Sequence, residues 1–129
     1  MELKRLTATP VTLEWLKKLT QFHGPLLFYQ SGGCCEGSAP LCLPQGDYRI
    51  GDSDVFLGMI GETPFYMSES QFEYWKHTQL IIDVIEGGGN AFSVESPEGI
   101  SFHTRSHVFT QEQMVKLALQ APPLRGKQH

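Results

Sequence analysis

Residues 30–44 read QSGGCCEGSAPLCLP, and the rest of the chain is organised around this stretch. It contains all three cysteines of the protein, Cys34, Cys35 and Cys42. Its glycines let the backbone approach a ligand closely, while Pro40 and Pro44 disfavour regular structure, so we expect an open loop. Thiolates bind zinc, copper(I) and iron–sulfur clusters, and they are also good nucleophiles. The stretch therefore predicts a functional thiol or metal site.

Two other interpretations of the cysteines stay open. Free cysteine often serves as a small hydrophobic residue, so the three could only shape the turn. A disulfide is the second alternative, although a bond between the adjacent Cys34 and Cys35 would strain the peptide and form only as a redox state.

Length and charge limit the class of protein. A chain of 129 residues is long enough for one self-supporting domain, which we place at residues 1–120, followed by a flexible tail at 121–129. The sequence contains ten Lys and Arg residues, 14 Asp and Glu residues, and no basic run. This composition argues against nucleic acid as a partner. No apolar run is long enough to span a membrane. The N-terminal MELKRLTATP lacks the apolar region of a signal peptide, so we expect a cytoplasmic protein with reduced thiols.

Capping signals predict three helices. Thr9-Pro10 opens the first and Gly24 follows its end, while Ser68 with Gln71 and Thr110 with Gln113 form capping-box patterns. The apolar side of the first helix includes Leu13, Trp15, Leu16, Leu19 and Phe22. The three helices span residues 10–22, 68–76 and 110–120.

Apolar runs between turn signals predict seven strands, of which QLIIDVI at residues 79–85 is the richest in β-branched side chains. Gly61-Glu62 marks a hairpin turn. The strands span residues 26–29, 47–50, 54–60, 64–67, 79–85, 91–95 and 100–109. This pattern predicts an α+β, mostly antiparallel fold.

A metal site needs a fourth donor beside three thiolates, or an open position for catalysis. We favour His77, which follows the middle helix and precedes the strongest strand. A histidine there can instead cap the last carbonyls of the helix. His103 and His107 are four apart on one predicted strand, so they share a face but stand too far apart to bind one ion. Glu36, or a ligand from a second subunit, is the alternative fourth donor.

An enzyme is the alternative to a metal-binding protein. A nucleophilic thiolate requires a nearby base, and Cys35 with His77 is the pairing that the sequence offers. The chain has no phosphate-binding loop, because the glycines at 87–89 lack a following Lys-Ser/Thr.

The runs FYQSGGCCEGSAPLC and GETPFYMSESQFEYWKHTQLIIDVIEGGGNAFSVESPEG resemble a family of small bacterial proteins of unknown function. Members are commonly encoded beside aldehyde and alcohol dehydrogenases. The resemblance covers residues 9–109. It implies a cysteine motif at Cys34, Cys35 and Cys42, and a tryptophan–histidine motif at Trp75, His77, Thr78 and Gln79.

A fainter resemblance is to the HesB-like A-type iron–sulfur carriers. The matching pieces are the first helix, the strand at 26–29, Gly33-Cys34-Cys35, Thr78-Gln79-Leu80 and Ser96-Pro97. The resemblance implies a small β pseudo-barrel with an N-terminal, a short middle and a C-terminal helix. The carriers' C-terminal Cys-Gly-Cys is absent here, so Cys42 and His77 would replace those ligands.

Together these features predict a metal-binding accessory protein, rather than an enzyme, with Cys34, Cys35, Cys42 and His77 as ligands. The metal would be zinc, iron or an iron–sulfur cluster, or copper(I). An aldehyde or alcohol dehydrogenase is the expected partner, and sheet edges that need covering suggest a homodimer. A small cysteine-dependent enzyme or redox thiol protein acting on an aldehyde-derived or thiol substrate is the runner-up. An interaction module is the third possibility.

Overall fold

The computed structural model describes residues 4–30, 40–47, 50–51, 54–87 and 98–120. Within these ranges the chain forms seven strands, three α-helices and one short 3-10 helix. In chain order they are β1 (Leu6–Ala8), α1 (Pro10–His23), β2 (Leu26–Gln30), β3 (Leu41–Pro44), η1 (Gln45–Asp47), β4 (Val55–Ile60), β5 (Thr63–Met67), α2 (Glu69–Trp75), β6 (Thr78–Glu86), β7 (Ile100–Val108) and α3 (Gln111–Leu119).

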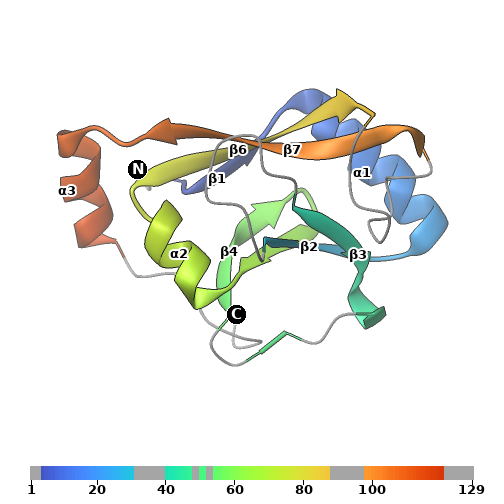
Figure 1. Cartoon of the computed structure of the whole chain (residues 1–129), viewed down its shortest axis with the longest axis horizontal. Helices are drawn as coiled ribbons and strands as arrows, with labels where there is room; N and C mark the ends of the chain where they lie inside the picture. The colour runs from blue at the N-terminus through green and yellow to red at the C-terminus, as the bar shows by residue number, and fades with distance from the viewer. Residues whose placement is uncertain (1–3, 31–39, 48–49, 52–53, 88–97, 121–129) are drawn as a thin grey trace.

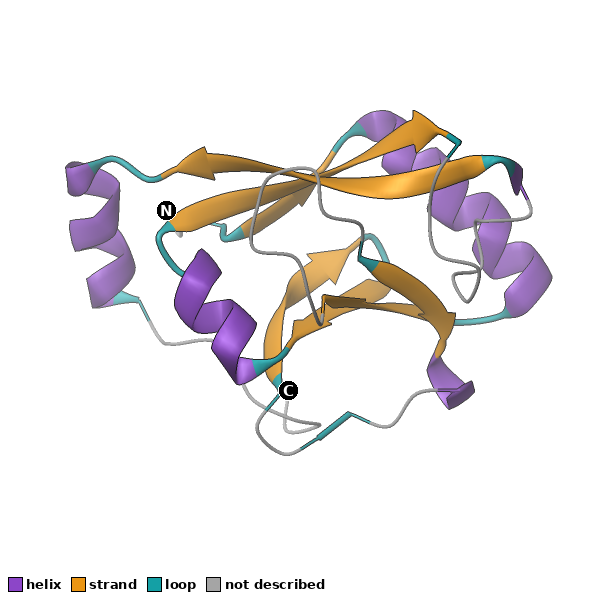
Figure 2. Ribbon diagram, viewed as in Figure 1, coloured by secondary structure: helices purple, strands orange, loops and turns teal. Residues whose placement is uncertain are grey.

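The strands form two sheets, one in the order β3-β2-β5-β4 and the other in the order β1-β6-β7. Figure 1 shows the sheets facing one another, with α1 and α2 toward opposite ends and α3 beyond α2. The same layers are coloured by secondary structure in Figure 2. The α+β class is confirmed. Among the described residues, however, the strands form two separate sheets and do not close into a barrel.

Both sheets are mixed: three of the five strand pairings among the described residues are antiparallel, in line with a mostly antiparallel fold, and two are parallel. The pairs β2–β5 and β1–β6 are parallel, whereas β2–β3, β4–β5 and β6–β7 are antiparallel. The sequence pattern missed β1 altogether. A three-residue strand has too few side chains to show a period, and here its pairing with β6, Leu6 opposite Leu80, defines it.

The cysteine stretch is not wholly an open loop, because Leu41–Pro44 forms β3. Pro44 lies opposite Leu26 at the end of this edge strand, a position where the missing N–H of proline is tolerated. The strand predicted at 47–50 is wrong at its start, since Asp47 ends the 3-10 turn.

The main core lies between the two sheets. The ring of Phe28 from β2 contacts Phe102 from β7 edge-to-face at 5.0 Å between centroids, and it contacts Phe65 from β5 at 5.6 Å. All three side chains are fully buried. The helices add Leu16 and Leu19 from α1 and Phe72 and Trp75 from α2.

The helix boundaries follow the capping signals. The hydroxyls of Thr9, Ser68 and Thr110 accept hydrogen bonds from the backbone at the starts of α1, α2 and α3. The complete capping box forms only at α3. At α2 the side chain of Gln71 instead accepts a hydrogen bond from Trp75 Nε1.

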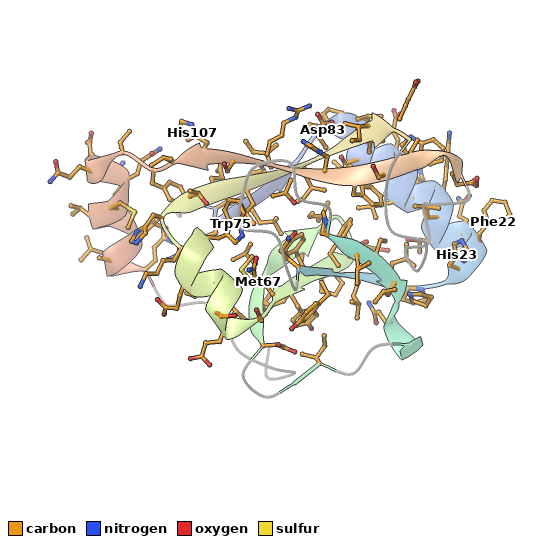
Figure 3. The ribbon with its side chains drawn as sticks, in the orientation of Figure 1. Phe22, His23, Met67, Trp75, Asp83 and His107 are labelled. Carbon is orange, nitrogen blue, oxygen red and sulfur yellow. The ribbon has the colours of Figure 1, made fainter. Side chains whose placement is uncertain are left out.

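The buried side of α1 is narrower than its sequence suggests. Thr12, Leu16 and Leu19 are its buried residues, whereas Phe22 is 82% exposed. Phe22 lies in the last turn of the helix, away from the sheets (Figure 3).

Two predicted features, the strand at 91–95 and the tail at 121–129, lie outside the described residues. Of the helices that the structure describes, none is both long and apolar enough to cross a membrane.

Candidate functional site

The candidate site lies where β2 ends. Because β2 and β5 are parallel neighbours, Gln30 and Met67 end their strands side by side. Residues 31–39 join Gln30 to Pro40, and both of these flanking residues are buried. The antiparallel pairing of β2 with β3 therefore fixes both ends of the segment at one position of the four-stranded sheet. Cys34 and Cys35 belong to this segment and lie outside the described residues.

Cys42 is fully buried on β3, directly opposite Phe28. Directly paired residues point to the same face of a sheet, and Phe28 packs against Phe102 of the other sheet. The thiol of Cys42 therefore faces the space between the sheets, where it belongs to the main core. Its position fits both the predicted ligand and a small hydrophobic residue.

Gln30 and Thr104 form a polar pair inside this apolar space. Thr104 Oγ1 on β7 donates to Gln30 Oε1 at 3.4 Å, and neither side chain has any exposed surface. Gln30 is two residues after Phe28, so it points to the same face as Phe28 and Cys42. No buried side-chain nitrogen or oxygen of the described residues lacks a hydrogen-bond partner. The pair is thus a satisfied polar link between the two sheets.

His77 lies in the turn between α2 and β6, and its side chain is exposed. Its backbone is held in place, because the N–H of Phe109 donates to the carbonyl of His77 at 3.0 Å. The imidazole itself makes no hydrogen bond or ion pair with any residue in the described ranges.

In the described residues, the imidazole of His77 makes no hydrogen bond to a carbonyl of α2, and its alternative role as a helix cap stays a prediction. The carbonyl of Trp75 accepts the hydroxyl of Thr78 at 2.9 Å, and the carbonyl of Lys76 accepts Nη1 of Arg5 at 2.8 Å. The side chains of Thr78 and Arg5 therefore satisfy these two carbonyls at the end of α2.

The structure does not bring Cys42 and His77 together. Phe102, which packs next to the partner of Cys42, pairs with Val84 on β6. His77 precedes Val84 by seven residues, which is roughly 23 Å along a strand. Ligands of one zinc ion stand only about 4 Å apart, as bond lengths near 2.0–2.3 Å require. Cys42 and His77 of one chain are therefore too far apart to bind the same zinc ion.

The outer face of the three-stranded sheet carries a second polar group. His103 pairs with Asp83 and His107 pairs with Gln79, and both histidines share one face, as predicted. Figure 3 shows Asp83 and His107 on this outer face, away from the inter-sheet space that holds Met67 and Trp75.

Asp83 is the best-connected carboxylate on that face. It accepts the N–H of Val84 at 2.8 Å, Nε of Arg105 at 2.9 Å and the hydroxyl of Thr9 at 3.0 Å. These contacts lower the pKa of Asp83, the Val84 N–H having the largest effect, and they outweigh the opposing effect of partial burial. This network fastens the start of α1 to the sheet.

The described residues contain no group of three His, Cys, Asp or Glu that can hold a metal ion. Sequence analysis missed Gln30 and Thr104, although a glutamine ending the run LLFYQ is a polar residue where a buried strand is expected. Nothing in the sequence marks Thr104, because it is one of several alternating residues on β7.

Comparison with known protein families gives a match. Neither the curated proteins nor the solved structures contain a significant match to the chain. Residues 15–108 match the family described as "Domain of unknown function (DUF779)", and this stretch includes every candidate ligand. Because the match spans most of the chain, the protein belongs to this family of unknown function.

Proposed function

We propose that the protein is a metal-binding accessory protein in which Cys34, Cys35 and Cys42 supply the thiolate ligands. The observation that carries the proposal is the burial of Gln30 and Pro40 on either side of the segment that contains two of the cysteines. With both ends fixed in the sheet, that segment starts and finishes beside the inter-sheet space that holds Cys42.

The spacing of the residues supports this assignment. Cys34 follows Gln30 by four residues, a reach of up to about 14 Å for an extended chain. Cys35 precedes Cys42 by seven residues along a segment that returns to its starting strand. A returning segment of this length lets three sulfurs approach to about 4 Å, the separation that a tetrahedral zinc site requires. Thiolates equally suit iron–sulfur clusters and copper(I).

We assign the fourth donor to His77, whose exposed imidazole has no partner among the described residues. Because Cys42 and His77 are far apart in one chain, the imidazole comes from a second copy. A twofold homodimer then holds two equivalent sites, each with the cysteines of one chain and the partner's His77.

The wider role rests on the resemblance of the cysteine and Trp-x-His motifs. We propose that the protein acts in the cytoplasm and delivers metal to, or protects, an aldehyde or alcohol dehydrogenase encoded beside it. The likeness to HesB-like carriers is part of the same proposal. In it, the two facing sheets correspond to the pseudo-barrel of those carriers, but they are not closed.

The first test is metal analysis and an absorption spectrum of protein purified without a chelator. Stoichiometric metal is expected, with sulfur-to-iron charge-transfer bands for iron and a colourless protein for zinc or copper(I). Cys34→Ser, Cys35→Ser and Cys42→Ser should each lower the metal content. Full metal content in all three variants would remove the proposal.

His77→Ala should lower metal affinity by about 10- to 100-fold with the fold intact. His107→Ala is the matched control, because His107 is also exposed and lies on β7, opposite Gln79 of β6. Unchanged metal affinity in His77→Ala would exclude this residue and leave Glu36 as the next donor to test.

The assignment across the dimer has its own experiment. Cys35→Ser and His77→Ala proteins, each poor in metal, are mixed and allowed to exchange subunits. Mixed dimers should regain one complete site in two, whereas a site built within one chain regains its metal in neither variant. Protein with reactive thiols but no metal would favour the runner-up, a cysteine-dependent enzyme or redox thiol protein.

A further inference from the structure

Gln30 and Thr104 are unusual among the described residues because they join the two sheets through side-chain polar atoms. The space around them is otherwise built from apolar side chains such as Phe28, Met67 and Phe102, all fully buried. Burying two polar groups there costs desolvation, and the hydrogen bond recovers only part of it. A pair of apolar residues would hold the sheets together equally well, so stability alone does not account for this pair.

The position of the pair suggests what it does. Gln30 is the last residue of β2, so it lies at the point from which the cysteine-containing segment leaves the sheet. Its side chain points to the same face as the thiol of Cys42, which lies opposite Phe28. Thr104 belongs to the opposing sheet and is held at 0% exposure in the middle of β7.

We propose that Gln30 and Thr104 are positioning residues that fix the end of β2, and with it Cys42, for binding a thiophilic metal ion. This inference rests on the proposed function. A directional hydrogen bond defines the depth and orientation of the strand end, whereas apolar contacts tolerate small shifts. Ligands that are fixed in advance bind a metal more tightly, because less order has to be created on binding.

The test compares two buried threonines. Thr104→Val removes the hydroxyl that reaches Gln30 but keeps the shape of the side chain. Thr12→Val is the matched control: Thr12 is also fully buried, and its hydroxyl donates to the carbonyl of Ile82 at 2.8 Å, at the start of α1. Thr104→Ser restores the hydroxyl. Gln30→Met provides a second variant if Thr104→Val does not fold.

Zn²⁺ affinity is measured by chelator competition on the full chain, and the free energy of unfolding is measured by urea titration. Thr104→Val should bind Zn²⁺ about tenfold more weakly, the size of effect typical for residues that orient a metal ligand. Thr104→Ser should bind Zn²⁺ as tightly as the natural protein. Thr12→Val should also keep its Zn²⁺ affinity, although its fold is less stable. Equal Zn²⁺ affinity in Thr104→Val and the natural protein would overturn the inference.

A second readout separates this inference from the proposed function. If the natural protein binds none of zinc, iron and copper(I), the proposed function fails, and alkylation of Cys42 in a Cys34→Ser/Cys35→Ser background decides whether the pair positions the thiol. Thr104→Val should then speed alkylation of Cys42 severalfold more than Thr12→Val does, because Thr12→Val speeds it only through its loss of stability. An unchanged alkylation rate in Thr104→Val would show that the pair does not position Cys42.

Discussion

The two polar clusters of this molecule hold the fold in different ways. Gln30 and Thr104 are neutral, fully buried and link one sheet to the other. Thr9, Asp83 and Arg105 form a charged cluster at the surface, where they link the start of α1 to the three-stranded sheet. A buried neutral pair is costly to break, because the Thr104 hydroxyl then loses its partner and cannot reach water. A surface cluster loses less, because water replaces the missing contact.

The largest stability effect is expected for Gln30→Leu. It leaves the Thr104 hydroxyl buried without a partner, so the free energy of unfolding should fall by about 1–3 kcal/mol. Thr104→Val should lower the free energy of unfolding less in the Gln30→Leu protein than in the natural protein, since both polar groups are then gone. Urea unfolding of the two single variants and the double variant measures this coupling. Simple additivity would show that the two side chains do not interact.

Thr9→Ala should have the next largest effect. Thr9 caps α1 and also donates to Asp83, so its loss should cost about 1 kcal/mol, within the usual range for a helix cap. Thr110→Ala at the start of α3 is the control, because α3 has a full capping box but buries only Leu117. Thermal unfolding should show a clear loss for Thr9→Ala and a smaller one for Thr110→Ala. The reverse order would mean that α3 contributes more to the folded state than its burial indicates.

The smallest effect concerns pH. The pKa of Asp83 is lower in the folded than in the unfolded protein, so its contacts stabilise the fold above the ordinary aspartate pKa of about 3.9. That contribution is lost as the pH falls through the folded-state value. Stability measured by urea unfolding at a series of pH values should therefore decline less on acidification in Asp83→Asn than in the natural protein. Parallel curves for the two proteins would contradict this assignment.

Local signals in the sequence predicted most of the elements. Thr9-Pro10, Ser68 and Thr110 mark the helix starts, because a cap depends only on residues within one turn. The strand β6 follows from its β-branched side chains, and the β4–β5 hairpin follows from Gly61, whose φ of 60° suits glycine. These features are determined by neighbours in the chain.

The strand pairings and much of the candidate site could not be predicted from the sequence and were given only by the tertiary structure. The parallel pairs β1–β6 and β2–β5 join distant segments, and their register leaves no local pattern. The end of α2 is a further example: Arg5, 71 positions from Lys76 in the chain, donates to the Lys76 carbonyl.

The sequence by itself determined the three capped helices, the strongest strands and the concentration of cysteines in one stretch. The tertiary structure alone decided that Gln30 meets Thr104, that Cys42 faces the inter-sheet space, and that Cys42 and His77 lie at different levels of the sheets. The physical reason is the distance along the chain over which each interaction acts. Caps and turns act over three or four residues, whereas the position of a side chain between two sheets depends on strands whose pairing is chosen by the whole core.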